Sequence, residues 1–315
     1  MLRLSRSTVA AIVAAAAAGA AVLPSVAARG NIFVTNFSGG TIGEYSSTGS
    51  PIGTSLVSGL TTPFGLALSG SDLFVASIGG TIDEYTTSGT TVSSPLITTG
   101  PSTTSEPVDV AVSGSDLFVV DIKAGTVGEY TTSGTTVNAS LISGLSSPVS
   151  IAISGSDLFV ANYASGISGA GTIGEYTTAG AVVNKSLITG LTTPYGIAVM
   201  GSDLFVVNQS GNSIGEYTTS GSVVNASLIN LGSSSKPYEL AVSGSDLFVA
   251  NFGNNTVGEY TISSGGTVSA SNASLITGLD GPVGIAVTTP EPVSLSLLAI
   301  GGVALLLGKR RRRSA

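Results

Sequence analysis

The sequence contains no cysteine and no histidine, and only 9% of its residues are charged. Without cysteine no disulfide can form. Without histidine, Ser-His-Asp catalysis, Cys-His catalysis and histidine-ligated zinc are excluded. The charged fraction is far below the roughly 25% of an average soluble domain. Glycine, serine and threonine take its place, but short apolar runs recur along the chain, so the composition does not predict disorder.

The few charges are distributed unevenly. Seven of the eleven basic residues lie near the two ends, and between Arg29 and Thr289 there are four basic and seventeen acidic side chains, a net charge of about −13. A body with this charge repels phosphate backbones, which argues against nucleic-acid binding. Cations and neutral polar molecules are the partners that fit better.

The first 28 residues have the organisation of a secretory signal peptide. Arg3 and Arg6 precede an apolar run over residues 9–23, and small residues follow at 25–28. This order predicts export and removal of residues 1–28 by signal peptidase. The alternative is an N-terminal membrane anchor, for which the apolar run is short.

The last 26 residues combine a motif, a short apolar segment and a basic cluster. Pro290-Glu291-Pro292 precedes the apolar segment 293–308. The cluster that follows consists of Lys309, Arg310, Arg311, Arg312 and Arg313. This order resembles the PEP-CTERM sorting signal of Gram-negative bacteria. The resemblance implies that a membrane-embedded exosortase recognises the motif and removes the tail.

Residues 290–315 are therefore expected to act as a sorting signal. Segment 293–308 would hold the protein transiently in the inner membrane as a short transmembrane helix, with the basic cluster on the cytoplasmic side. The alternative is a plain C-terminal anchor with an accidental Pro-Glu-Pro. On the sorting interpretation the mature protein belongs to the cell envelope or the extracellular matrix.

The word Gly-Glu-Tyr, or a close copy of it, recurs six times at spacings of 40 to 46 residues. A repeat of this period is typical of a solenoid, a propeller or an array. The six copies end in Glu44-Tyr45, Glu84-Tyr85, Glu129-Tyr130, Glu175-Tyr176, Glu216-Tyr217 and Glu259-Tyr260. Because the glutamate is present in every copy, we interpret it as a residue of the scaffold.

Each repeat predicts four short antiparallel strands. In one unit, apolar strands are expected at 197–199 and 204–208, a third strand at 214–218 and a mixed fourth strand at 223–229. The first strands are expected to begin near Leu66, Val110, Ile151, Ile197, Leu240 and Ile285. The change from apolar to mixed strands suits a radial stack of sheets with a buried centre.

The two ends of the body are complementary fragments of one repeat. The body begins on a second strand, 32–36, and ends on an unpaired first strand, 283–287. We therefore predict an all-β, six-bladed β-propeller over residues 29–289, with four-stranded blades and a C-terminal strand that joins the N-terminal blade. Short helical segments are expected at the two termini. A linear β-solenoid would not explain the complementary ends.

The strand words Pro-x-Gly-Ile-Ala-Val and Leu-Phe-Val-Ala-Asn resemble those of the NHL and SMP-30 group of six-bladed propellers. The resemblance spans the whole body. SMP-30-like lactonases and the related streptogramin lyases use a metal or an acid–base group at a central mouth. The resemblance therefore implies that a site of this protein would lie at the mouth. This sequence lacks the usual aspartate after the first strand and the basic residues common in NHL repeats.

Differences between the copies gather on the face that carries the links into the first strands, which we call the mouth face. Where three copies start the first strand with Gly65, Gly196 or Gly284, the other three have Asp109, Ser150 and Glu239. The second strands end in Asn36, Ser77, Asp121, Asn162, Asn208 and Asn251. Antiparallel pairing predicts Asp109 beside Asp121, with Glu239 three blades away across the ring.

This pattern allows a binding site for a cation or a polar ligand at the mouth. Its candidate residues are Asp109, Asp121, Glu239, Ser150, Asn36, Asn162, Asn208 and Asn251, and calcium is the cofactor that such oxygen ligands would suit. Lys123, Lys236, Glu106 and the insert 163–171 are expected on the same face. The alternative is that the amides satisfy local backbone groups and the acids face solvent.

Three functions are compatible with the sequence. The first is a non-catalytic exported propeller that acts as a structural or binding module and contacts exopolysaccharide or another surface protein. The second is a metal-dependent propeller hydrolase or lactonase that uses Asp109, Asp121 and Glu239. The third, which overlaps the first, is a carbohydrate- or protein-binding module that uses aromatic residues near the mouth, namely Phe37, Tyr163, Tyr195, Tyr238 and Phe252.

Overall fold

The computed structural model of the chain describes residues 30–163, 169–263 and 266–288. The expected signal peptide, the sorting tail with its apolar segment, the terminal helices and most of the insert lie outside the described residues. No helix in the described part of the chain has the length and apolar character that a membrane span needs.

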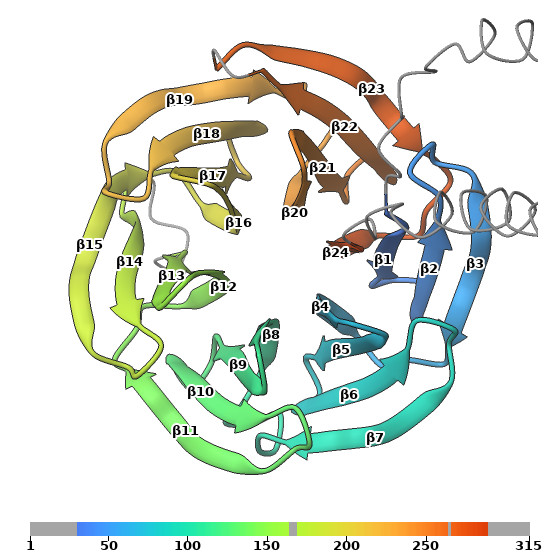
Figure 1. Cartoon of the computed structure of the whole chain (residues 1–315), viewed down its shortest axis with the longest axis vertical. Coiled ribbons are helices and arrows are strands. Elements are labelled where there is room, and N and C mark those ends of the chain that lie inside the picture. Colours follow the sequence, from blue (N-terminus) through green and yellow to red (C-terminus); the bar gives the residue numbers. More distant parts are fainter. Residues whose placement is uncertain (1–29, 164–168, 264–265, 289–315) are drawn as a thin grey trace, which may run out of the picture. The chain divides into compact units, whose positions relative to one another are not determined.

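The described residues form six antiparallel sheets of four strands each, arranged around an axis as blades (Figure 1). From the axis outward, blade 1 contains β24 (Pro282–Val287), β1 (Ile32–Asn36), β2 (Thr41–Tyr45) and β3 (Pro51–Ser58), blade 2 contains β4 (Pro63–Ser69), β5 (Asp72–Ser77), β6 (Thr81–Thr86) and β7 (Thr91–Thr98), and blade 3 contains β8 (Pro107–Ser113), β9 (Asp116–Asp121), β10 (Thr126–Thr131) and β11 (Thr136–Ser143).

The other three blades follow the same order. Blade 4 contains β12 (Pro148–Ser154), β13 (Asp157–Asn162), β14 (Gly171–Thr177) and β15 (Val182–Leu191), blade 5 contains β16 (Pro194–Met200), β17 (Asp203–Asn208), β18 (Ser213–Thr218) and β19 (Val223–Asn230), and blade 6 contains β20 (Pro237–Ser243), β21 (Asp246–Asn251), β22 (Thr256–Ile262) and β23 (Val268–Ile276). The predicted all-β, six-bladed propeller is confirmed.

Blade 1 joins the two ends of the propeller. Its inner strand β24 pairs antiparallel with β1, with Ile32 opposite Val287 and Val34 opposite Ile285. Next to this ladder, the N–H of Asn31 donates to Oγ1 of Thr288 at 2.7 Å. The predicted closure by a C-terminal strand is confirmed, and it leaves no free strand edge where the ring meets.

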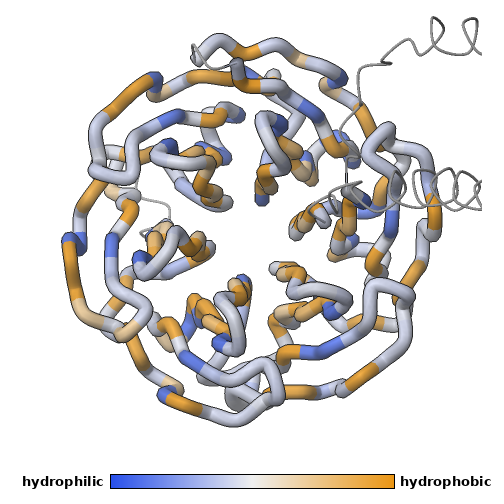
Figure 2. Tube along the Cα trace, viewed as in Figure 1, coloured by the Kyte–Doolittle hydropathy of each residue, from blue (hydrophilic) through white to orange (hydrophobic). Residues whose placement is uncertain are grey.

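Side chains become more exposed with distance from the axis. The second strand β17 is buried along almost its whole length, whereas most residues of the outermost strand β19 are exposed. Figure 2 shows apolar residues concentrated on the inner strands and a mixture of both kinds on the outer ones. One apolar cluster fills each space between neighbouring blades in the described propeller, so each blade depends on both of its neighbours.

The inner strands begin at a proline, three residues before the positions that the sequence predicts. These prolines are Pro63, Pro107, Pro148, Pro194, Pro237 and Pro282. Proline is tolerated at the first position of a strand because its missing N–H removes no bond from the ladder there. In every blade the register with the second strand shifts just after the proline, so the next two residues form a bulge at the mouth face.

In five of the six copies the residue two positions before the tyrosine is a glycine that packs against the tyrosine ring, whereas blade 2 has Asp83 there. Both residues lie on the same face of the strand. A Cβ added to Gly215 would lie 2.8 Å from Cε2 of Tyr217 and 3.0 Å from the backbone oxygen of Ala226. Gly43, Gly128, Gly174 and Gly258 are equally close to their tyrosines. The repeated word is therefore a packing unit of the scaffold.

We predict that Gly215→Ala destabilises the protein by about 1–3 kcal/mol, because the added methyl group has no room beside the Tyr217 ring. Urea denaturation followed by circular dichroism measures the change. Gly79→Ala is the control, since a Cβ at Gly79 meets nothing within 4 Å, and its effect should stay within about 0.5 kcal/mol. Equal stability of the two variants would contradict this account of the repeat.

Candidate functional site

The mouth face is built in the same way in all six blades. The first residue after the second strand donates its N–H to the carbonyl of the residue before the inner-strand proline, as from Tyr163 to Ser147 (3.0 Å) and from Phe252 to Lys236 (3.2 Å). Ser147 and Lys236 have positive φ angles of 51° and 43°. Such angles are uncommon outside glycine and persist only where the surroundings hold them. In the described part of this face, these hydrogen bonds therefore anchor the start of each inner strand to the end of the second strand beside it.

The glycines of the inner strands make room for the neighbouring blade. A Cβ at Gly196 would lie 2.7 Å from the Cα of Glu239, and one at Gly65 would lie 2.6 Å from the Cα of Asp109. At Gly284 it would lie 2.3 Å from the backbone oxygen of Phe64. These three positions are glycine because the adjacent inner strand leaves no space for a side chain.

Asp109 and Ser150 each bind the inner strand of the following blade. The carboxylate of Asp109, only 6% exposed, accepts hydrogen bonds from the N–H groups of Val110 (2.8 Å) and Ile151 (2.9 Å). The hydroxyl of Ser150 accepts one from the N–H of Ile197 at 3.3 Å. Both side chains therefore satisfy amides that the bulge leaves outside the ladder.

Glu239 closes this arrangement from the other side. One of its oxygens accepts from the N–H of Leu240 at 3.2 Å and lies 2.4 Å from where a Cβ of Gly196 would be. Its carboxyl therefore lies over Gly196, where it also bonds the Ser150 side chain and the backbone of Ile197. The structure thus brings together Asp109, Ser150 and Glu239, although they come from blades 3, 4 and 6.

Burial changes the acidity of both carboxyl groups. It raises the pKa of Asp109 from 3.8 to about 6, against the opposing effect of the hydrogen bonds from Ile151, Val110 and Ser150. Burial, and secondarily the charge of Asp109, raises the pKa of Glu239 well above 4.5. Two interacting carboxyls of this kind titrate as a pair, and near neutral pH the pair retains part of its protons.

Asp121 does not belong to this group, contrary to the prediction that it lies beside Asp109. Asp109 is aligned with Val120, and Asp121 with Pro107. Successive residues of a strand point to opposite faces, so Asp109 points toward blade 4 and Asp121 toward blade 2. Asp121 instead accepts from the N–H groups of Lys123 (3.0 Å) and Ala124 (2.8 Å) and organises its own loop.

The asparagines that end the second strands also lie away from the axis. Their side chains lie on the same face of the sheet as Asp121, which is directed into the spaces between blades. The Nδ2 groups of Asn36, Asn162 and Asn251 bond to nearby threonines, whereas Oδ1 of Asn162, Asn208 and Asn251 is buried without a hydrogen-bond partner in the described part of the chain. Nδ2 of Asn36 donates to Oγ1 of Thr41 at 3.1 Å, and Nδ2 of Asn162 does so to Oγ1 of Thr172 at 3.4 Å. Asn208 and Asn251 hold the same strand position. Of the predicted set, only Asp109, Ser150 and Glu239 gather at the axis.

The cation site expected from the sequence is not assembled at the mouth. Within the described residues, no three or more acidic, histidine or cysteine side chains are placed to hold a metal ion together. Lys123 and Glu106 form an ion pair at 3.0 Å at the edge of blade 3, and both are partly exposed. Asp121, the third acid that the calcium hypothesis requires, points away from Asp109 and Glu239.

A cluster of six aromatic side chains crosses the mouth face. Ring contacts join Phe37 to Phe64 (6.1 Å between centroids) and Phe64 to Tyr238 (5.8 Å). Tyr238 also contacts Tyr195 (4.8 Å) and Phe252 (5.2 Å), and Tyr195 contacts Tyr163 (5.4 Å). We call these six residues the aromatic patch. It draws on blades 1, 2, 4, 5 and 6.

Every ring of the aromatic patch is half-buried. Most contacts are edge-to-face, with interplanar angles of 65° to 85°, an arrangement that aromatic pairs favour. Burial and the neighbouring Tyr238 and Tyr163 raise the pKa of Tyr195 above its ordinary value. The sequence named five of these residues as near the mouth, but it missed Phe64 and could not show that they form one patch.

Comparison with known proteins supports the fold. No protein-family model and no curated protein matches the sequence. A chain from a nidogen–laminin complex has 13% identity and a TM-score of 0.65, covering 83% of this chain and 99% of that one. A streptogramin B lyase has 20% identity and a TM-score of 0.60, covering 81% and 83%. At these identities the similarity shows the fold alone.

A third similar structure is the virginiamycin B lyase of Staphylococcus aureus. It has 19% identity and a TM-score of 0.55, and the match covers 82% of this chain and 85% of that one. The similar structures therefore include a lyase and a protein in a binding complex, both on a propeller fold.

The buried carboxyl pair predicts a falling stability as the pH rises. The pKa of each group is higher in the folded than in the unfolded protein, so between these values the folded state binds more protons. The free energy of unfolding therefore decreases as the pH rises. The contribution of Asp109 is lost between about pH 3.8 and about pH 6. The loss should be on the order of 2–3 kcal/mol, and urea denaturation at several pH values measures it.

Two variants should change this slope in opposite directions. Glu239→Gln removes one member of the pair, and the decline should become shallower. Ser150→Ala removes a hydroxyl whose hydrogen bonds lower the pKa of both carboxyls, so the decline should extend to higher pH. Identical slopes in the wild type and in both variants would show that the pair does not titrate as described.

Proposed function

We propose that this protein is an exported, non-catalytic β-propeller that binds a neutral carbohydrate through the aromatic patch at its mouth. The observation that carries the proposal is the patch itself, six half-buried rings in mutual contact across five blades. Phe64, Tyr163 and Tyr195 also pack against the apolar clusters between the blades. Aromatic rings that gather on one face and are only partly covered are common in binding surfaces. The exopolysaccharide of a cell-surface matrix is the partner class that fits.

The chemistry of the patch favours a neutral ligand with apolar ring faces. Tyrosine provides a flat apolar surface and a hydroxyl that can bond a sugar hydroxyl. The acids of the inner strands, Asp109 and Glu239, are already engaged by backbone amides and by Ser150, which leaves them poorly available to a cation. Rings with few polar groups beside them are the usual lining of a site for such a ligand.

Two observations support a non-catalytic role. A variant of the Staphylococcus aureus virginiamycin B lyase with histidine replaced by alanine is described as catalytically inactive, and the present sequence contains no histidine. The metal-dependent alternative requires several acids around one point, and the described residues provide no such group. The pair Asp109 and Glu239 serves instead to tie inner strands together.

Export and sorting complete the proposal. They are supported by the sequence alone, namely by the charged and apolar order of residues 1–28 and by Pro290-Glu291-Pro292 with its apolar segment and arginine cluster. Signal peptidase and an exosortase would be the processing partners. The propeller would then reach the cell envelope or the extracellular matrix without its tail.

The binding proposal predicts the effect of replacing Tyr195. In affinity gels containing a soluble neutral polysaccharide such as dextran or xyloglucan, Tyr195→Ala and Tyr238→Ala should weaken binding by about tenfold or more, as loss of a central aromatic ring does. Tyr195→Phe keeps the ring and should retain most of the binding. If neither alanine variant changes the retardation of the protein, or none occurs in the wild type, the patch is not a carbohydrate site.

The sorting proposal predicts the ends of the mature protein. Mass spectrometry of the protein recovered from its host should show that residues 1–28 and the tail after the Pro-Glu-Pro motif are absent. Replacing Pro290, Glu291 and Pro292 by alanine should leave the tail intact and retain the protein in the membrane fraction. Ser294→Ala is the control. Detection of the intact arginine cluster on the mature wild-type protein would overturn the sorting proposal.

A further inference from the structure

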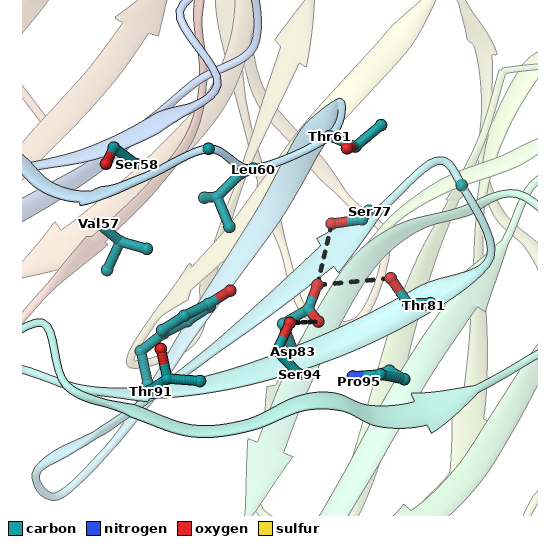
Figure 3. A pocket seen from close by; sticks show the side chains of 13 residues that line it. Val57, Ser58, Leu60, Thr61, Ser77, Thr81, Asp83, Thr91, Ser94 and Pro95 are labelled. Atoms are coloured by element: carbon teal, nitrogen blue, oxygen red, sulfur yellow. Dashed lines mark hydrogen bonds between the residues drawn. The ribbon is translucent and has the colours of Figure 1, made fainter.

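A cavity of about 520 Å³ lies between the outer parts of blades 1 and 2. Residues 57–61, at the end of β3 and in the link that follows, form one wall. The other wall comes from β5, β6 and β7 of blade 2, including Asp83 and Tyr85. Figure 3 shows Val57 and Leu60 on the wall from blade 1, across from the carboxylate of Asp83.

Blade 2 differs from the other blades at this place in two residues. Asp83 occupies the position that is glycine in every other copy of the Gly-Glu-Tyr word, and Ser77 ends a second strand that ends in asparagine in blades 1, 4, 5 and 6. Blade 2 thus has the small hydroxyl of Ser77 in place of an asparagine amide, and the carboxylate of Asp83 in place of a glycine. The scaffold itself needs neither change, because four blades are built without them.

The carboxylate of Asp83 is 7% exposed and is held by three hydroxyl groups. Ser94 Oγ donates to its Oδ1 at 2.7 Å, while Ser77 Oγ and Thr81 Oγ1 donate to its Oδ2 at 3.3 and 3.4 Å (Figure 3). Because a carboxylate can only accept hydrogen bonds, each of these hydroxyls donates its single hydrogen to Asp83. What the hydroxyls still offer a ligand is oxygen lone pairs. Around Asp83 the wall therefore presents acceptors, while the hydroxyls of Tyr85 and Thr91 line the same side of the cavity.

No positive side chain balances this buried charge inside the cavity. Neither lysine nor arginine is among the described residues that line it. A buried carboxylate without a cationic neighbour favours a positively charged occupant. Val57, Leu60 and Pro95 add apolar surface to the lining, which suits a carbon skeleton.

We propose that this cavity binds a small organic ammonium ion, a primary amine carried on a skeleton of about the size of a sugar ring. The N–H donors of the ammonium group face Asp83 and the lone pairs of Ser77, Thr81 and Ser94. The skeleton lies against Val57 and Leu60. The volume is within the range of roughly 300–1,000 Å³ that is typical of small-molecule sites.

The neighbouring space between blades 6 and 1 provides an internal comparison. It holds an equivalent cavity of about 500 Å³, lined by Asn36, Thr41 and Tyr45 where the first cavity has Ser77, Thr81 and Tyr85. Its counterpart of Asp83 is Gly43, and the acid in its lining is the exposed Asp280. Of these two cavities, only the one between blades 1 and 2 has a buried carboxylate in its lining.

Three ligands that share one ring test the proposal by isothermal titration calorimetry at about pH 6. Glucosamine carries the ammonium group, whereas glucose and N-acetylglucosamine are neutral. We expect glucosamine to bind at least about tenfold more tightly than either neutral sugar. Equal affinities, or no binding of glucosamine, would overturn the proposal. So would tight calcium binding that depends on Asp83 and excludes glucosamine.

Variants then assign the binding to the cavity. Asp83→Asn should lower the affinity for glucosamine by about tenfold or more. The double variant Ser77→Asn, Asp83→Gly restores the pair found in blades 4, 5 and 6, so it should fold normally and lose the binding. Asp280→Asn, in the lining of the second cavity, is the control and should bind as the wild type does. Unchanged affinity in the double variant would place the ligand elsewhere.

Discussion

The antiparallel pairing of β24 with β1 is the interaction on which the rest of the structure depends. It pairs the two ends of the described propeller, and directly beside it a hydrogen bond joins Asn31 to Thr288, 257 positions apart in the sequence. Without β24, blade 1 would lose its inner strand, and the apolar clusters on both of its faces would be open to water. Since every blade is buried only by its neighbours, closure of the ring stabilises all six.

Once the ring is closed, its near-identical copies make the departures stand out. At the axis, Gly65, Gly196 and Gly284 leave room for the adjacent inner strand. Asp109, Ser150 and Glu239 bond backbone amides of other blades, namely those of Ile151 and Ile197. On the outer side the same principle operates at Asp83, which takes the place of a glycine. In both places added carboxylates turn packing positions into polar ones, two of them at the axis (Asp109 and Glu239) and one between blades 1 and 2 (Asp83).

Much of the fold could be predicted because its signals are local. The period of the Glu-Tyr word, the apolar strand words and the complementary ends gave the number of blades and the closure, and the structure confirms them. The site could be predicted only in part. Asp109 and Asp121 were expected side by side, but a bulge after Pro107 places them on opposite faces of the sheet. In the sequence, Asp83 is noticeable only as an aspartate where the other copies of the Gly-Glu-Tyr motif have glycine. Its hydrogen bonds with Ser77, Thr81 and Ser94 depend on the tertiary structure.

By itself the sequence determined the architecture and excluded histidine and cysteine chemistry, and for the two ends it provides the prediction of export and sorting. These properties follow from composition, spacing and order along the chain, which need no knowledge of contacts. Only the tertiary structure decided which polar groups meet. Asp109, Ser150 and Glu239 converge from three blades, and six aromatic rings from five, because the ring brings inner strands together and a shift of one residue reverses the face of a side chain.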